Sequence, residues 1–298
     1  MLRVAIVAAL MFGASIPDAT ADEPPVPSGS LKWKQFARQV NGVHPVFTAS
    51  SGNKVGLMWL NPQVLRFRLI PGTTAPEKSP VRAIDNRPST WVPRLVAAFN
   101  GGFLLKDNPG GYFYNGRTVT PMVDGMGTLV FTKDGGLDVT VWRKGDHISK
   151  DVIAIRQNWE PLVIRGKDQS SANDSWYRWG GTDGKSPLAN RSAVGQTNSG
   201  EIVYAFCAKC VAHDLGVALV GANVETAMIL DMNKSWPNGF YYSAPKSKHG
   251  KPVGHRIHPG QWRGPTDYFF RGSKDIVVAD AVKPAPAPEP TPAPTPAQ

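Results

Sequence analysis

The sequence predicts an α+β fold, with a large and mostly antiparallel or mixed β-sheet core, one or two helices, and a single domain. Short apolar runs that end in Gly, Pro or Asn-Gly recur along the chain and indicate many strands. A convincing helical stripe of apolar residues occurs only over Ala212 to Gly221. Roughly 250 residues lie between the two terminal segments, which is enough for one large core.

The two ends of the chain are expected to lie outside this fold. Met1 to Ala21 has a basic residue, an apolar run and an Ala-Thr-Ala ending, which is typical of a secretory signal peptide. Lys283 to Gln298 reads KPAPAPEPTPAPTPAQ, a proline-rich composition that favours an extended, disordered tail. We therefore expect a signal peptide at 1–21, an N-terminal extension at 22–53, a main domain at 54–282 and a tail at 283–298. The expected location is secreted or periplasmic, with no membrane span.

The charge of the chain limits the classes of molecule that it is expected to bind. The formal net charge is +10, and the basic residues are scattered, with no basic helix and no zinc-finger spacing. This distribution argues against nucleic acid as the partner. For an exported protein, a phosphate-bearing glycan or an anionic envelope polymer is the better fit.

The first part of the main domain is predicted to be mostly strands. Leu31 to Val43, in the extension, has mixed helical spacing and predicts a short helix. Lys54 to Leu60 and Val64 to Ile70 are predicted as neighbouring strands around the Asn61-Pro62 turn. The second alternates apolar residues with arginine, so one face is buried. Leu95 to Phe99 is an apolar strand that stops at Asn100.

Hairpins are predicted wherever a turn signal separates two apolar runs. They cover Gly110 to Thr120, Gly127 to Arg143 around Lys133-Asp134-Gly135-Gly136, and Arg191 to Phe206 around Asn198-Ser199-Gly200. Further strands are expected over Asp151 to Ile155, Leu162 to Ile164 and Thr226 to Leu230, and extended segments over Pro265 to Phe270 and Asp275 to Ala279.

The two cysteines, Cys207 and Cys210, are predicted to form a local disulfide in an oxidising compartment. His213 extends the spacing to C-x-x-C-x-x-H, but a structural zinc site needs a fourth ligand, and none is evident nearby. A thioredoxin-like site is the other alternative, without the rest of that fold in the sequence. We expect no cofactor and no required metal.

Polar residues follow four apolar runs in the segments AAFNGGF, IRQNWEP, RSAVG and ILDMN. Asn, Arg and Asp residues placed where strands end and loops begin are typical of a binding or catalytic site on a rigid scaffold. In the first segment, the amides of Gly101 and Gly102 beside Asn100 could form an anion-binding turn. A plain β-turn is the alternative.

Three motifs occur together in one order: NGGF at Asn100 to Phe103, RSAVG at Arg191 to Gly195, and AMILD at Ala227 to Asp231. This set resembles the phosphodiester glycosidase family, and LRFRLIPGT at Leu65 to Thr73 is similar to the entry strands of that family. The resemblance covers roughly Leu57 to Val278. After Asp231 the family commonly has a glycine run, whereas this chain has Met-Asn-Lys-Ser-Trp. The difference indicates a diverged branch that acts on another glycan.

The resemblance implies a hydrolase that cleaves a sugar-1-phosphodiester, or a related linkage, on its glycosidic side. Asp231 would supply the carboxylate, with Glu160 as a candidate partner. Arg191 would bind phosphate through its guanidinium. Asn100, Gly101, Gly102, Asn158 and Asn233 would hold phosphate or sugar hydroxyls. For each of these residues a structural role is the alternative: a sheet-edge arginine, a capping or turn aspartate, a loop glutamate. The alternative function is a non-catalytic envelope protein that binds anionic polysaccharide.

Overall fold

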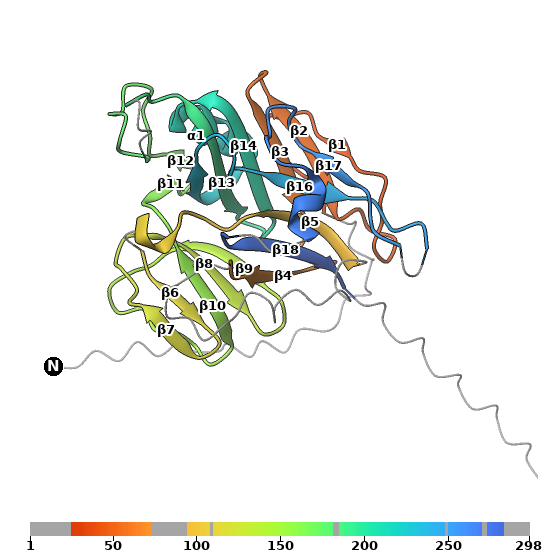
Figure 1. Ribbon diagram of the computed structural model, residues 1–298, viewed down its shortest axis with the longest axis horizontal. Helices are drawn as coiled ribbons and strands as arrows, with labels where there is room; N and C mark the ends of the chain where they lie inside the picture. Colours follow the sequence, from red (N-terminus) through yellow and green to blue (C-terminus); the bar gives the residue numbers. More distant parts are fainter. Residues whose placement is uncertain are drawn as a thin grey trace, which may run out of the picture.

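The computed structural model describes residues 25–72, 94–107, 110–180, 185–247, 250–269 and 273–282. Its strands form three sheets, in which every strand pairing is antiparallel (Figure 1). The largest sheet has eight strands in the order β1-β2-β3-β14-β13-β15-β11-β12. These are β1 (Lys34–Gln35), β2 (Val46–Ser51), β3 (Val55–Leu60), β11 (Pro161–Ile164), β12 (Lys167–Asp168), β13 (Ala189–Thr197), β14 (Ile202–Cys210) and β15 (Val224–Met232).

Two five-stranded sheets complete the fold. The first has the order β7-β6-β10-β8-β9, from β6 (Tyr112–Tyr114), β7 (Arg117–Thr120), β8 (Gly127–Thr132), β9 (Leu137–Val141) and β10 (Val152–Gln157). The second has the order β17-β16-β5-β18-β4, from β4 (Leu65–Ile70), β5 (Leu95–Asn100), β16 (Gly239–Tyr242), β17 (Gly254–Arg256) and β18 (Ile276–Ala281). Two short 3-10 helices, η2 (Leu105–Asp107) and η3 (Pro265–Phe269), lie in the connections.

The main hydrophobic core lies where the three sheets meet. Tyr204 of the eight-stranded sheet, Phe131 of the first five-stranded sheet and Phe99 of the second are all fully buried in it. Burial of this kind contributes about 25 cal/mol per Å² of apolar surface. The core therefore holds three curved sheets in one body and fixes how their edges meet.

The single α-helix of the described residues, α1 (Ala212–Gly221), covers the other face of the eight-stranded sheet (Figure 1). Leu215 and Leu219 lie on the buried side of α1 and pack in a second hydrophobic core that also contains Trp59. The helix begins at Ala212 because the Asp214 carboxylate accepts the backbone N–H of Val211 at 3.0 Å, which caps the first turn. No helix among the described residues combines the length and the hydropathy that crossing a bilayer requires.

The predicted fold class is confirmed, and so are the hairpins β8–β9 and β13–β14 and the bounds of α1. Two predictions of element type are wrong. Leu31 to Val43 is not a helix: Phe36 donates its N–H to Val46, and Val40 bridges Val43, so this segment lies extended along the sheet. The segment from Pro265 forms η3 and not an extended strand.

The predicted neighbours β3 and β4 belong to different sheets, because the chain turns out of the first sheet at Asn61-Pro62. The predicted boundary at residue 54 falls between β2 and β3, which pair along their length. The predicted signal peptide and the proline-rich tail lie outside the described residues.

Candidate active site at the end of β15

The eight-stranded sheet and the second five-stranded sheet meet at the end of β15. There Asp231 of β15 lies opposite Ser192 of β13, and Ser192 accepts a hydrogen bond from the Asn100 amide at the end of β5 at 2.9 Å. Asn100 in turn lies opposite Ile276, the first residue of β18. The residues just before β18, Lys274 and Asp275, are thereby brought to Asp231. Two strand ends and one strand start thus converge at this point.

Asp231 forms a buried ion pair with Lys274. Its Oδ2 accepts a hydrogen bond from the Lys274 ammonium at 2.5 Å, and its Oδ1 accepts the Met232 N–H at 2.7 Å and the Asn233 amide at 3.0 Å. Asp231 has 0% of its surface exposed and Lys274 has 9%. Burial raises the pKa of Asp231 above its ordinary value, although the Lys274 ammonium opposes this shift. A carboxyl group in this setting is suited to proton transfer nearer neutrality.

A β-bulge directs Asp231 toward Lys274. On β13 the consecutive residues Ser192 and Ala193 lie opposite Asp231 and Ile229, so Leu230 is the extra residue of β15. The Asn158 amide donates to the carbonyls of Ile229 at 2.5 Å and Leu230 at 2.7 Å. Bulges re-aim the side chain that follows them and are common beside active sites. Asn158 therefore stabilises the irregular backbone of the bulge, which places the Asp231 side chain on the same face of the sheet as Ser192.

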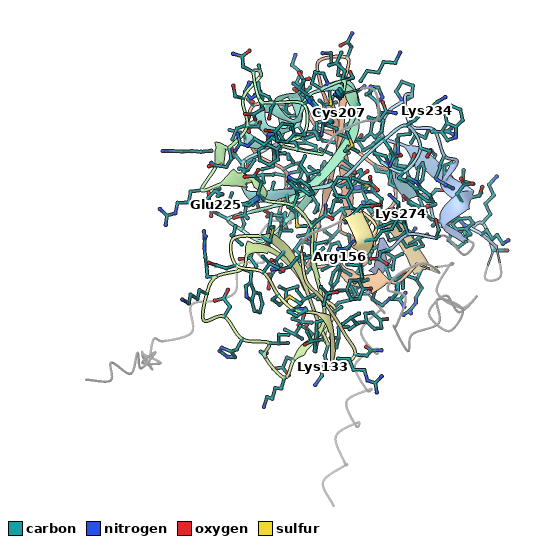
Figure 2. The ribbon with its side chains drawn as sticks, turned by 60° about the vertical axis from the view of Figure 1, so that its left-hand side comes forward. Lys133, Arg156, Cys207, Glu225, Lys234 and Lys274 are labelled. Carbon is teal, nitrogen blue, oxygen red and sulfur yellow. A yellow bond between two sulfur atoms is a disulfide. The ribbon has the colours of Figure 1, made fainter. Side chains whose placement is uncertain are left out.

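A second buried ion pair lies beside the first. The Arg156 Nε donates to Asp275 Oδ2 at 3.0 Å, and the other guanidinium nitrogens donate to the carbonyls of Gln157 and Phe103. Asp275 Oδ1 accepts the Gly72 N–H at 2.9 Å. Arg156 and Lys274, which are labelled in Figure 2, are both buried. Arg156 thus anchors the segment that presents Lys274, and each of its three guanidinium nitrogens donates to protein.

The Asn-Gly-Gly turn lies at this site, and its polar groups have protein partners. Asn100 Oδ1 accepts the Tyr204 hydroxyl at 2.9 Å and the Asn238 N–H at 3.2 Å, and the Gly101 N–H donates to the Asp275 carbonyl at 2.8 Å. Gly102 has φ of +143°, and a Cβ there would lie 2.8 Å from Asn158 Oδ1. Glycine is required here by conformation and by the close approach of Asn158.

Asn233 is also brought to Asp231. Its amide donates to Asp231, and its Oδ1 accepts the backbone N–H groups of Ser235 at 2.8 Å and Trp236 at 2.7 Å. It therefore shapes the loop that directly follows Asp231. This loop carries Trp236, whose ring lies 4.2 Å from the Arg263 guanidinium carbon and 5.0 Å from the Lys274 nitrogen.

Trp236, Arg263 and Lys274 form a basic–aromatic rim next to Asp231. The Arg263 Nε is buried and has no hydrogen-bond partner among the described residues. Next to this rim, the Lys234 ammonium lies 4.3 Å from the centroid of Trp262, a side chain that is 61% exposed. Cations and aromatic faces in this arrangement suit a substrate that has both an anionic group and a sugar ring.

Two predicted site residues are not brought to Asp231. Arg191 lies on the opposite face of β13 from Ser192, and its guanidinium donates to the carbonyls of Trp179 at 2.7 Å, Pro187 at 3.1 Å and Cys210 at 3.3 Å. Its phosphate-binding role remains a prediction that this geometry does not favour. The Glu160 side chain is 43% exposed and pairs with Arg178 at 3.4 Å. No contact among the described residues joins Glu160 to Asp231.

Sequence reasoning missed Lys274, Asp275, Arg156 and Arg263. The ends of apolar runs predict site residues, whereas Lys274 and Asp275 precede such a run. Arg156 lies in the segment IRQNWEP, in which the same pattern predicts Asn158 and Glu160. Its place directly after the apolar run from Val152 to Ile155 was the available signal, because a charged residue at the end of a buried strand needs a buried partner.

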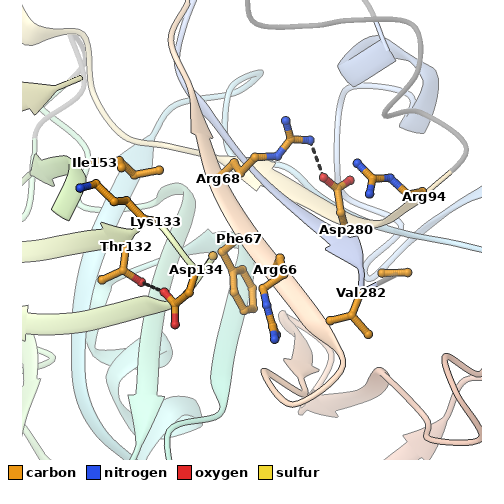
Figure 3. Close-up of a pocket in the computed structure, with 12 residues that line it drawn as sticks. Arg66, Phe67, Arg68, Arg94, Thr132, Lys133, Asp134, Ile153, Asp280 and Val282 are labelled. Atoms are coloured by element: carbon orange, nitrogen blue, oxygen red, sulfur yellow. Dashed lines mark hydrogen bonds and ion pairs between the residues drawn. The ribbon is translucent and has the colours of Figure 1, made fainter. Parts of the chain in front are cut away.

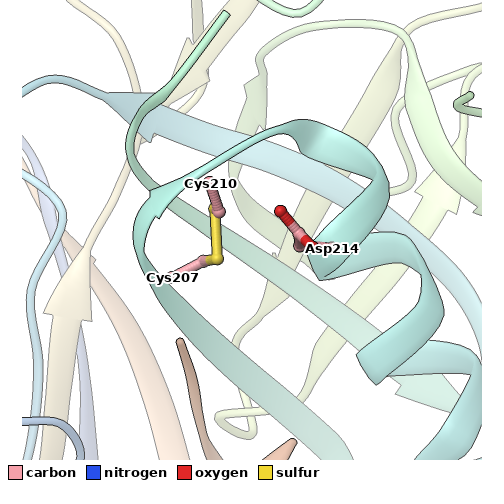
Figure 4. Close-up of side chains that lie close together, drawn as sticks. All are labelled: Cys207, Cys210 and Asp214. Atoms are coloured by element: carbon pink, nitrogen blue, oxygen red, sulfur yellow. A yellow bond between two sulfur atoms is a disulfide. The ribbon is translucent and has the colours of Figure 1, made fainter. Parts of the chain in front are cut away.

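The cysteine motif lies apart from this site, beside α1 (Figure 4). Cys207 and Cys210 are disulfide-bonded with a Cα–Cα distance of 6.0 Å, as predicted. Asp214 approaches the two sulfur atoms to within 4.8 Å, but these sulfurs are bonded to each other and are not thiolates. His213 pairs with Asp168 at 2.7 Å and does not complete a metal site with the cysteines.

Two solved structures are similar to this chain. The chain is 15% identical to the catalytic domain of zebrafish N-acetylglucosamine-1-phosphodiester alpha-N-acetylglucosaminidase auto-inhibited by its pro-peptide, over 88% of this chain and 85% of that chain, with a TM-score of 0.48. It is 11% identical to a hypothetical protein from Synechocystis, over 88% of this chain and 65% of that chain, with a TM-score of 0.45. Among curated proteins there is no match.

The family model of the phosphodiester glycosidases matches residues 93–231, which include Asn100, Arg156, Asn158 and Ser192 and end at Asp231. Over this segment, which is a little less than half of the chain, the sequence is similar to the phosphodiester glycosidase family.

Proposed function

We propose that this protein is a hydrolase that cleaves a sugar-1-phosphodiester at its glycosidic bond, with Asp231 as the catalytic carboxylate. The observation that carries the proposal is the convergence on Asp231 of the polar residues that the family match contains. Asn158 stabilises the bulge before Asp231, and Asn100 joins Ser192 opposite it. Lys274, from outside the match, neutralises the carboxylate. A rigid carboxylate held by such a network fits a catalytic group.

The reaction breaks the bond between the anomeric carbon and the phosphate oxygen. Water supplies a hydroxyl group to the sugar and a proton to the products, and the phosphate leaves as a monoester. Asp231 would act as base toward water or as nucleophile toward the anomeric carbon. Phosphate needs little protonation to leave, so the site must instead hold its charge. Lys274 and Arg263 are our candidates for this task, because each presents a cation beside Trp236.

Asp231 has no exposed surface, and this determines how substrate would reach it. Its Oδ1 is bonded by residues that directly follow it in the chain, and Oδ2 by Lys274. Lys274 is therefore the group that substrate would meet first, and a substrate phosphate would compete with Asp231 for its ammonium. This exchange would free the carboxylate for the anomeric carbon. Asp231 and Lys274 would thus act as one unit.

Export belongs to the same proposal. Met1 to Ala21 would be removed as a signal peptide, and the domain would act outside the cytoplasm. A glycan or glycophosphate of the envelope or of the extracellular medium would then be the substrate. The local disulfide fits an oxidising compartment.

A second candidate is a non-catalytic protein of the same fold that binds anionic polysaccharide. It is favoured by the full burial of Asp231 and by the protein partners of Asn100 and Gly101. In this case the Asp231–Lys274 pair would only stabilise the junction of the sheets. The net charge of +10 would supply the attraction, which weakens as salt is added.

The deciding experiment is turnover of a panel of synthetic sugar-1-phosphodiesters by the mature protein, with and without a chelator. Release of free sugar is expected, and its loss in chelator would reveal a required metal. If no member of the panel is cleaved while anionic polysaccharide binds in a salt-dependent way, the binding protein is the correct assignment.

A further inference from the structure

A cavity of about 470 Å³ lies at the other end of β18 from the candidate active site (Figure 3). It is bounded by β4, by the turn of the β8–β9 hairpin and by the end of β18. Its charged lining residues are Arg66, Arg68, Arg94, Lys133, Asp134 and Asp280. We propose that this cavity binds an anionic saccharide, one with a phosphate or a carboxylate close to its ring hydroxyls.

The position of the cavity separates it from Asp231. Asp280 pairs with Arg66 and Leu95 across the sheet, whereas Ile276 at the start of β18 pairs with Asn100. Four residues of strand span about 13 Å. The cavity therefore has its own lining and shares none of the residues placed at the active site.

The lining carries an excess of positive charge. Four cations against two carboxylates leave a net charge of +2. Asp134 is engaged by the Thr132 hydroxyl at 2.5 Å, and Asp280 by the Arg68 guanidinium. Within the described residues, Arg66, Arg94 and Lys133 form no ion pair with a carboxylate. These three cations can bind an anion without breaking an existing pair.

A second feature points to hydroxyl groups on the same ligand. Asp280 is 4% exposed, and its Oδ1 has no hydrogen-bond partner among the described residues, although Oδ2 is paired with Arg68. A buried carboxylate oxygen without a donor is costly. An anion would be repelled by it, but a sugar hydroxyl would donate to it. Cations beside an unsatisfied acceptor therefore fit an anionic saccharide better than a simple anion.

The walls of the cavity are held in place. The Phe67 N–H of β4 donates to the Gly135 carbonyl of the hairpin turn at 2.8 Å. Gly135 has φ of +88°, and a Cβ there would lie 2.5 Å from Cδ of Arg66, so the turn lies directly against the arginine stem. Two sheets are thus fixed to each other at the cavity. A preorganised site loses less entropy when it binds a small ligand.

The test is isothermal titration of the mature protein with glucose 6-phosphate, glucuronate, glucose and inorganic phosphate. We expect glucose 6-phosphate or glucuronate to bind. The ligand with the higher affinity shows whether the cavity prefers a phosphate or a carboxylate. Arg66→Gln/Arg94→Gln should weaken this binding by at least about tenfold, because two charged donors are lost. The matched control Arg117→Gln/Lys144→Gln removes two exposed charges elsewhere and should change affinity less than about twofold. Asp231→Asn should also leave it unchanged, which separates this cavity from the active site.

Asp280→Asn distinguishes the saccharide from a simple anion. It should weaken binding of the preferred sugar acid but not of inorganic phosphate, because only the sugar donates a hydroxyl to Asp280. Asp280→Asn also breaks the buried pair with Arg68. If Asp280→Asn does not fold, the Arg66→Gln/Arg94→Gln variant decides whether the cavity binds the ligand. Equal affinity for phosphate and for glucose 6-phosphate, retained affinity in the double variant, or no binding of either sugar acid would overturn the proposal.

Discussion

The two faces of the eight-stranded sheet hold buried charge in opposite ways. On the face covered by α1, the Arg191 guanidinium donates only to backbone carbonyls, and burial lowers its pKa to about 10. On the other face, Asp231 is paired with Lys274 and lies opposite Ser192, the residue that follows Arg191. Successive strand residues point to opposite faces. One short motif, Arg-Ser, therefore supplies a structural cation to one face and a site residue to the other.

The comparison shows how to separate structural charge from functional charge. A buried cation whose donors all meet carbonyls holds loops together and has no donor left for a ligand. A buried cation that donates only to a carboxylate, as Lys274 does to Asp231 among the described residues, can exchange that partner for a substrate anion. By this criterion we propose Lys274 as the functional cation, and Arg156 and Arg191, which donate to backbone carbonyls, as structural ones. The following predictions test that division.

The largest effect is expected for Asp231→Asn. Turnover of the best phosphodiester should fall by about 10²- to 10⁴-fold, the usual contribution of a general acid or base. The asparagine keeps the shape of the side chain and its contacts with Met232 and Asn233. Asp124→Asn, a change at an exposed turn where the carboxylate accepts the Lys144 N–H, is the control in the same kinetic assay. Full activity of the Asp231 variant, with unchanged folding, would remove Asp231 from the mechanism.

Arg191→Met tests whether Arg191 stabilises the fold and takes no part in the reaction. The free energy of unfolding should fall by about 3 kcal/mol, because several buried carbonyls lose a charged donor. Urea denaturation measures this change, with Arg117→Met as a surface control. Activity per folded molecule should persist. A loss of activity above about 100-fold at unchanged stability would assign phosphate binding to Arg191 after all.

Lys274→Met should lower kcat/KM by about 10- to 100-fold, the effect of one lost charge-assisted hydrogen bond. It should also move the acidic limb of the pH–rate profile upward, because Lys274 lowers the pKa of Asp231 against the effect of burial. Lys144→Met serves as the control. An unchanged pH profile would show that Lys274 does not act on Asp231.

The smallest effect concerns pH and stability. Because the folded-state pKa of Asp231 is raised by burial, the folded protein binds its proton more tightly than the unfolded chain does. This carboxyl group therefore contributes stability that is present below the ordinary carboxyl pKa and is lost as pH rises through the raised value. Unfolding free energies from pH 4 to 8 should fall less steeply in Asp231→Asn. An identical slope in both proteins would show that the pKa is not raised.

Local sequence patterns were sufficient for the elements that local forces form. The Lys133-Asp134-Gly135-Gly136 turn, the Asn198-Ser199-Gly200 turn and the apolar stripe of α1 predicted the hairpins and the helix, because turn geometry and helical periodicity depend on neighbouring residues. The end of the apolar run before Asp231 likewise predicted a polar group at a sheet edge. The motifs NGGF and AMILD predicted Asn100 and Asp231 as site residues, and the segment IRQNWEP predicted Asn158, because each residue stands where an apolar run ends.

Only the tertiary structure decided which of these groups meet. Lys274 is 43 residues from Asp231 in the chain, and Asp275 is 119 residues from Arg156, so no local pattern could pair them. The direction of Asp231 depends on a bulge that the Asn158 amide holds from another strand. The face on which Arg191 lies depends on the register of β13, because a shift of one residue reverses every side chain. Strand register and long-range pairing are set by the packed core, and the sequence by itself determined the elements that the core arranges.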